Sequence, residues 1–250
     1  MTALTAGTLA RVSAIGPYFE VATGPRPPVS PGDARFRPLT ELYEDPGALE
    51  QYVRAVAARL GTDQPRVAAS TLHIGTASRL WSIALACAAL TGRVPDLGPG
   101  RLWWRPAATG PVALWLPEIR EVDSAAEAAL HETVAVRNLA PWADAVRRVS
   151  GVSAHSLRGN AASGLIGAHR VLLAREPRAP HPVADLVPRL LDRPPLAGAG
   201  THRTTPEGRI AFRRRSCCLY YRVPGAGKCG DCVLTQPEKA EKPERQEKTA

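Results

Sequence analysis

The residues best suited to chemistry lie near the C-terminus, where four of the five cysteines fall within sixteen positions. Cys217 and Cys218 are adjacent, and Cys229 and Cys232 follow after ten intervening residues as a Cys-x-x-Cys pair. Thiolates are soft ligands that bind Zn²⁺ or the irons of an iron–sulfur cluster. Since the chain before them is nearly free of cysteine, these thiols predict a single metal site.

The spacing of the cysteines bears on which metal they would hold. A structural zinc site usually joins two Cys-x-x-Cys knuckles, because each knuckle spans two corners of one tetrahedron. Only Cys229 and Cys232 form such a knuckle, while the side chains of adjacent Cys217 and Cys218 diverge in most backbone conformations. A diiron cluster offers binding positions that lie farther apart. The spacing therefore favours an iron–sulfur cluster and leaves zinc open.

Positive charge surrounds the cysteines in the sequence, with Arg214, Arg215 and Arg222 close to the ligands. Cations stabilise the reduced, more negative state of an anionic cluster, so these residues are candidates for tuning its potential. A zinc–thiolate site would also gain from nearby cations, so the charge alone does not decide between the metals. Backbone N–H groups that could donate to the sulfurs are expected at Gly225, Gly227 and Gly230.

The segments 214–222 and 229–234 resemble the closing signature of the FhuF-type ferric siderophore reductases. That family carries a [2Fe-2S] cluster on a Cys-Cys-x10-Cys-x-x-Cys motif. The resemblance extends over about residues 45–234. Two positions depart from it: Arg158 stands where the family often has Trp, and Ala226 interrupts the glycines before the knuckle. The first departure puts a substrate contact at that point in doubt, and the second is mild.

The resemblance implies an enzyme that reduces a ferric siderophore by one electron and releases Fe²⁺. A cytoplasmic location is expected because no secretory signal or membrane-spanning run is evident. Cys217, Cys218, Cys229 and Cys232 would hold the [2Fe-2S] cluster. The sequence has no Gly-x-Gly-x-x-Gly motif or phosphate-binding loop, so electrons are expected from a ferredoxin-like or flavoprotein-like partner. The alternatives are a non-catalytic siderophore- or iron-binding protein and a zinc-stapled interaction module.

Asn160 is a further candidate contact to the cluster or the substrate. It lies in a predicted helix beside Gly159, Ser163 and Gly167, which share one helical face and would let another backbone or the cysteine loop approach closely. Tight helix packing is the favoured interpretation of that face, and a ligand-facing role for Asn160 is the second. If buried, Asn160 needs a hydrogen-bond partner.

The elements expected around the site give a mostly helical α+β fold with a small β-hairpin and a C-terminal iron–sulfur loop. The hairpin is predicted from segments 101–105 and 112–116, and residues 193–209 are predicted to be loop. A capping-box pattern at Ser124 and Glu127 predicts a helix start. Helices are predicted at 45–61, 65–92, 124–138, 141–149, 153–174 and 182–191, with the cysteine loop packed against the helix 153–174.

Four segments are expected along the chain: a partly irregular N-terminal segment at 1–44, a reductase-like body at 45–209, the cluster motif at 210–234, and a disordered charged tail at 235–250. The net charge of +9 is carried mainly by scattered Arg, so nucleic-acid binding is not expected. No integral membrane segment is expected from the apolar run at 80–90, and no secretory signal from the start of the sequence. Cys87, within that run, is expected in the core.

Overall fold

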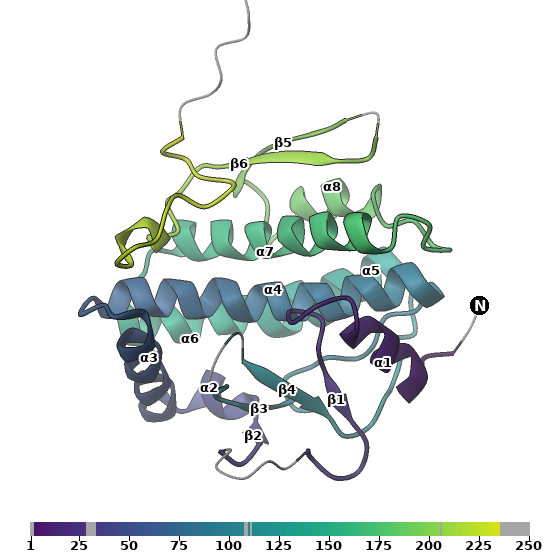
Figure 1. Cartoon of the computed structure of the whole chain (residues 1–250), viewed down its shortest axis with the longest axis horizontal. Helices are drawn as coiled ribbons and strands as arrows, with labels where there is room; N and C mark the ends of the chain where they lie inside the picture. The colour runs from purple at the N-terminus through teal and green to yellow at the C-terminus, as the bar shows by residue number, and fades with distance from the viewer. Residues whose placement is uncertain (1–2, 29–33, 108–109, 111, 206, 236–250) are drawn as a thin grey trace, which may run out of the picture.

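The computed structural model describes residues 3–28, 34–107, 110, 112–205 and 207–235. Its helical segments confirm a mostly helical α+β fold (Figure 1). These segments are α1 (Ala6–Ser13), α2 (Thr40–Glu44), α3 (Pro46–Leu60), α4 (Pro65–Thr91), α5 (Ala126–Leu130), the π-helix η1 (His131–Leu139), α6 (Ala140–Ser150), α7 (Ala154–Arg175), α8 (Leu186–Leu191) and the 3₁₀ turn η2 (Tyr220–Arg222).

Two long parallel helices, α4 and α7, form the centre of the molecule (Figure 1). The predicted helix from Pro65 is confirmed, and Gly92 ends it in the left-handed conformation that glycine favours. A Cβ atom at Gly164 would lie 3.0 Å from the backbone nitrogen of Ser78, so glycine lets α7 approach the α4 backbone. The Nε1 of Trp81 donates to the carbonyl of Ala161 at 3.1 Å and fixes the register of the two helices.

The predicted hairpin is present within a four-stranded sheet of order β1-β4-β3-β2. Its antiparallel core is β3 (Trp103–Arg105) and β4 (Ala113–Leu116), to which β1 (Ala22–Thr23) and β2 (Arg37–Pro38) add at the edges. Two-residue strands are too short to leave an alternating pattern in a sequence, which explains why both edges were missed.

The prediction of loop at residues 193–209 is wrong, because β5 (Gly200–Thr204) pairs antiparallel with β6 (Ile210–Arg214). The strand β5 is polar and carries no alternating apolar face, so its sequence resembles a loop. In contrast, β6 alternates buried and exposed side chains along its length. The hairpin matters for function because β6 leads directly into the cysteine loop.

The predicted helix start at Ser124 is also wrong, since α5 begins at Ala126 and its N-cap residue makes no side-chain capping bond. From there α5, η1 and α6 follow without a break, although a boundary was predicted before Pro141. Pro141 lies at the junction of η1 and α6, so the residue that lacks an N–H donor stands where the π-helix passes into the α-helix. The predicted helix at 182–191 is shorter than expected and begins at Leu186.

Residues from the N-terminal segment and from the C-terminal hairpin belong to one hydrophobic core, which includes Leu9, Phe19 and Phe212. The guanidinium of buried Arg79 on α4 donates to the carbonyls of Pro17 and Glu20, which fixes the N-terminal segment to the central helix. The boundaries proposed at 44/45 and 209/210 remain predictions. Most of the predicted disordered tail, residues 236–250, lies outside the described residues.

Among the described residues, α4 alone is long and apolar enough to cross a bilayer by length and composition. However, 83% of its most apolar window is buried inside the protein. Such burial is what the core helix of a globular domain shows, and α7 covers α4 along its length (Figure 1).

Candidate iron–sulfur site

The cysteine loop begins where β6 ends and passes over one end of α7 (Figure 1). Its four cysteines are free thiols: Cys218 and Cys232 are buried, and Cys217 and Cys229 are half-buried. The Sγ atoms of Cys218 and Cys229, one from each pair, are 3.5 Å apart. The fold thus brings together the two ends of the motif that the sequence separates by ten residues.

Backbone N–H groups donate to two of the sulfurs. The N–H of Leu219 donates to Cys217 Sγ at 3.3 Å, and the N–H of Leu234 donates to Cys232 Sγ at 3.4 Å. These bonds stabilise negative charge on sulfur. In the described loop, Gly225, Gly227 and Gly230, which were predicted as donors, make no such bond to a cysteine sulfur. Leu219 takes a left-handed conformation with φ of 66°, which turns the chain directly after the cysteine pair.

The departure at Ala226 has little structural effect. Gly225 adopts a positive φ of 74°, whereas Ala226 is not among the residues with positive φ in the described chain. A side chain is therefore tolerated at position 226 without backbone strain. Arg158, at the other departure, lies on α7 and lines a groove between α6 and α7, away from the cysteines.

Buried polar contacts attach the cysteine pair to the central helices. The Ser70 hydroxyl on α4 donates to the carbonyl of Cys218 at 2.7 Å. The Nδ2 of Asn160 on α7 donates to Ser70 Oγ at 2.9 Å and to the Ser70 carbonyl at 3.0 Å. Asn160 is fully buried and its amide is committed to these bonds and to Arg214. It is therefore placed to support the loop, and its role as a cluster or substrate contact remains a prediction.

Arg214 is the charged group most closely built into the site. It is only 2% exposed, and its guanidinium donates to Asn160 Oδ1 at 2.7 Å and to the carbonyls of Ser156 and Ser216 at 3.0 and 2.9 Å. A Cβ at Gly159 would lie 2.7 Å from the guanidinium, so the predicted close approach to that helical face is confirmed at this position. No carboxylate of the described residues forms an ion pair with Arg214.

Because no carboxylate forms an ion pair with Arg214 among the described residues, the cysteines are the candidates for its counter-charge. Burial lowers the pKa of Arg214, and the thiols of Cys218 and Cys229, followed by the carboxylate of Asp231, act against that shift. The sulfur–sulfur contact lowers the pKa of Cys218 to about 6 and raises that of Cys229, because one proton is held between them. A buried cation needs a nearby negative group. Thiolates, or the anionic cluster they hold, would supply it.

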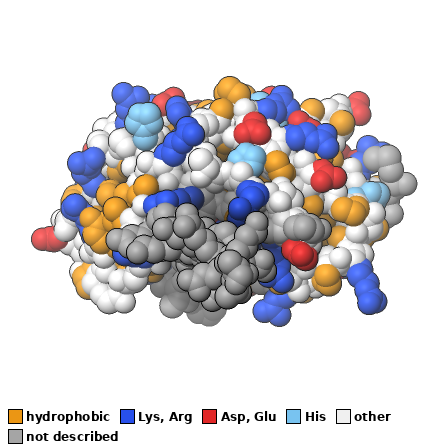
Figure 2. All heavy atoms as spheres, turned by 90° about the horizontal axis from the view of Figure 1, so that it is seen from above, with side chains coloured by type: hydrophobic (Ala, Val, Ile, Leu, Met, Phe, Trp, Pro, Cys, Tyr) orange, Lys and Arg blue, Asp and Glu red, His pale blue; other side chains and the backbone are white. Residues whose placement is uncertain are grey.

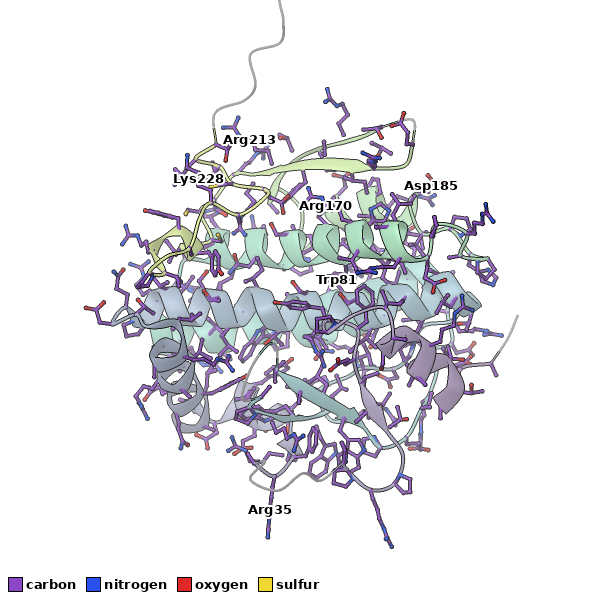
Figure 3. The ribbon with its side chains drawn as sticks, viewed as in Figure 1. Arg35, Trp81, Arg170, Asp185, Arg213 and Lys228 are labelled. Atoms are coloured by element: carbon purple, nitrogen blue, oxygen red, sulfur yellow. The ribbon has the colours of Figure 1, made fainter. Side chains whose placement is uncertain are left out.

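The Cys-x-x-Cys knuckle has its own attachment to α7. Arg170 Nη2 on α7 forms an ion pair with Oδ1 of buried Asp231 at 2.8 Å, and Figure 3 shows Arg170 below the segment that carries Arg213 and Lys228. The carbonyl of Asp231 accepts the N–H of Arg214 at 3.1 Å, which joins the knuckle to β6. Sequence reasoning missed Arg170 and Ser70, because their partners lie far away along the chain.

The other two candidate tuning residues, Arg215 and Arg222, are exposed. Arg222 donates to Gln64 Oε1 at 3.3 Å and its guanidinium lies over the ring of Tyr221. Seen from the side of the β5–β6 hairpin, the surface carries more Lys and Arg than Asp and Glu side chains (Figure 2). The site therefore combines one buried cation with exposed cations at its edge.

The donor set fits an iron–sulfur cluster in its chemistry: four thiols, two N–H···S bonds and a buried cation. Within the described residues, no three His, Cys, Asp or Glu side chains are already arranged to hold one metal ion. Only Cys218 and Cys229 have sulfurs in contact. The four cysteines therefore remain the predicted ligands.

Together, these features define the class of site: an all-cysteine redox centre on a loop attached to a helical body. Residues 214–234 match the family of the FhuF 2Fe-2S C-terminal domain, which confirms the FhuF-type resemblance for this segment. That match identifies the cofactor as a [2Fe-2S] cluster. No curated protein matches the chain.

A buried histidine next to the site predicts acid sensitivity. His73 on α4 stacks on Trp142, and neither ring nitrogen has a hydrogen-bond partner among the described residues. Burial, aided by the charge of Arg214, lowers its pKa from 6.5 to about 3. The unfolded chain therefore takes up a proton below about pH 6.5 that the folded chain refuses, so stability is lost as the pH falls from there toward 3.

We expect the step from pH 7 to pH 5 to cost about 2 kcal/mol through His73 alone. In His73→Leu this part of the loss should disappear, as measured by urea unfolding at both pH values. His155→Gln, a change at an exposed histidine, serves as the control and should behave like the wild type. An equal loss in His73→Leu and the wild type would show that His73 is not the acid-sensitive group.

Proposed function

We propose that this protein is a cytoplasmic ferric siderophore reductase, which transfers one electron to Fe³⁺ in its chelate and releases Fe²⁺. The observation that carries the proposal is the match of residues 214–234 to the FhuF 2Fe-2S C-terminal domain, on a loop with four free thiols. Without specifying the substrate, this match supports a protein that resembles the siderophore-iron reductases.

The chemistry needs only one electron. Siderophores hold Fe³⁺ through hard oxygen donors, and Fe²⁺ is a softer, less charged ion that the same donors bind far more weakly. When bound, the [2Fe-2S] cluster supplies a one-electron carrier. The iron is therefore released while the chelator stays intact, and Fe²⁺ and the free siderophore are the products.

The protein's own residues would hold the carrier and balance its charge. Cys217, Cys218, Cys229 and Cys232 would provide the ligands. Buried Arg214 would offset the negative charge that the site gains on reduction, because it has no carboxylate partner in the described chain. Half-buried Cys217 and Cys229 lie near the surface, which favours exchange of electrons with another molecule.

The electron would come from a ferredoxin-like or flavoprotein-like donor. Such donors are commonly acidic, and the exposed cations at the edge of the cysteine loop would attract an acidic surface. These cations are Arg213, Arg215, Arg222 and Lys228.

A direct assay tests the proposed activity. We expect protein purified without oxygen and reduced with dithionite, then freed of dithionite, to convert ferric chelates to Fe²⁺, trapped by a ferrous indicator. Iron and acid-labile sulfide should be present in equal amounts. A protein with an intact cluster that reduces none of a panel of hydroxamate, catecholate and mixed chelates would contradict the proposal, as would zinc without sulfide.

A further inference from the structure

A cavity of about 570 Å³ opens beside the cysteine loop, between α3, α4 and the residues just before β4. Cys218 and Cys229, the two cysteines whose sulfurs touch, form part of its wall. Tyr220 continues the wall on the loop side, and Tyr52 lies on the α3 side. A volume of this size is typical of pockets that hold a small-molecule ligand and is far more than two irons and two sulfides would fill.

Small side chains form part of the α4 wall of the cavity, beside Leu72 and Ile74. Thr71, Gly75 and Ser78 line it, and they follow one face of the helix. A Cβ atom at Gly75 would meet no other heavy atom within 4 Å, so the space in front of it is open. Glycine in the middle of a helix costs about 1 kcal/mol relative to alanine. The chain thus has a helix wall that leaves room next to the cysteines.

The charge of the cavity is one-sided, because no Asp or Glu is among its described lining residues. Arg59 lies at its edge, where the guanidinium is held by the carbonyl of Ala107 at 2.7 Å. Burial raises the pKa of Tyr52 to about 12, and Arg59 and Arg79 act against this rise. Both cations therefore act on the Tyr52 side of the cavity and favour an anion there.

We propose that this cavity binds the ferric chelate and that it prefers anionic chelates over cationic ones. The inference rests on the proposed function and adds a location and a charge preference to it. A chelate in the cavity would lie against Cys218 and Cys229, so its iron would be close to the cluster ligands. Tyrosine rings can contact the apolar parts of a chelator and donate hydrogen bonds to its oxygens.

Binding is tested separately from electron transfer with redox-inert Ga³⁺ chelates. We expect the cluster-loaded wild type to bind a trianionic Ga³⁺ tris-catecholate at least tenfold more tightly than a cationic Ga³⁺ trihydroxamate, measured by calorimetry at low salt. Arg59→Gln should weaken binding of the anionic probe about tenfold, whereas Arg54→Gln should not. Arg54 is the matched control because it lies on the same helix, is exposed, and does not line the cavity.

A second pair of variants tests the location. Gly75→Phe should fill the cavity and abolish binding, whereas Gly75→Ala should keep binding and slightly stabilise the helix. The visible spectrum of the cluster reports that each variant is intact. If Gly75→Phe keeps its cluster and binds or reduces chelates as the wild type does, the cavity is not the chelate site, although the reductase function stands. If the wild type reduces none of the chelates, the result would instead contradict the proposed reductase function.

Discussion

Replacement of Cys218 by Ser is expected to abolish the [2Fe-2S] cluster and leave the helical body folded. Cys218 lies at the centre of the site: its sulfur touches that of Cys229, and its carbonyl accepts the Ser70 hydroxyl. A serine oxygen is a harder and much less acidic ligand than a thiol, so it binds iron poorly in this setting. The Ser70 bond involves the backbone and survives the change.

The measurement is iron and sulfide content together with visible absorption and far-ultraviolet circular dichroism. We expect at least a tenfold loss of bound iron with nearly unchanged helical signal, because the core of α4 and α7 forms without the loop. Cys87→Ala is the control, since it also removes one sulfur but from the buried core of α4. A cluster that persists in Cys218→Ser would exclude Cys218 as a ligand, and global unfolding would make the site structural.

Replacement of Arg214 by Gln is expected to lower the reduction potential of the cluster. The guanidinium is buried beside the cysteines and forms no ion pair with a carboxylate among the described residues, and the thiols of Cys218 and Cys229 are the negative groups that act on it most, ahead of Asp231. At an effective dielectric constant of about 20, removal of this charge is expected to change the free energy of cluster reduction by about 1–2 kcal/mol. For one electron this equals a shift of about 40–90 mV to more negative values.

Potentiometric titration followed by electron paramagnetic resonance measures this shift. Arg214→Lys keeps the charge but loses part of the hydrogen bonding, so its potential should stay closer to that of the wild type. Arg213→Gln is the matched control, because Arg213 is adjacent but exposed, where solvent screens its charge. Equal shifts in Arg213→Gln and Arg214→Gln would show that burial of the charge is not what tunes the cluster.

Arg214→Gln should also reduce stability. The carbonyls of Ser156 and Ser216 and the amide oxygen of Asn160 would lose their donor, and each unsatisfied buried acceptor costs about 1–3 kcal/mol. The potential is therefore compared only among variants whose cluster content equals that of the wild type.

The sequence alone determined the cofactor and the main helices and predicted the four cysteine ligands, because each depends on residues close together along the chain. The cysteine motif lies within sixteen residues, and the boundaries of α3 and α4 follow from a proline at one end and a glycine at the other. It also placed the loop against α7, because the small residue Gly159 signals a close approach. The strand β5 was missed because its polar sequence resembles a loop. The continuous α5–η1–α6 segment was missed because Pro141 favours a helix boundary.

Only the tertiary structure decided how the site is held and where a substrate has room. Ser70, Arg170 and Asp231 meet their partners across long stretches of chain, and no spacing in the sequence connects them. In the sequence, Arg214 is one of several neighbouring arginines. In the fold, it is the one among them that is buried beside the thiols. The cavity at Gly75 likewise exists only because α3, α4 and the cysteine loop converge, and the shape of such a space depends on packing between distant segments.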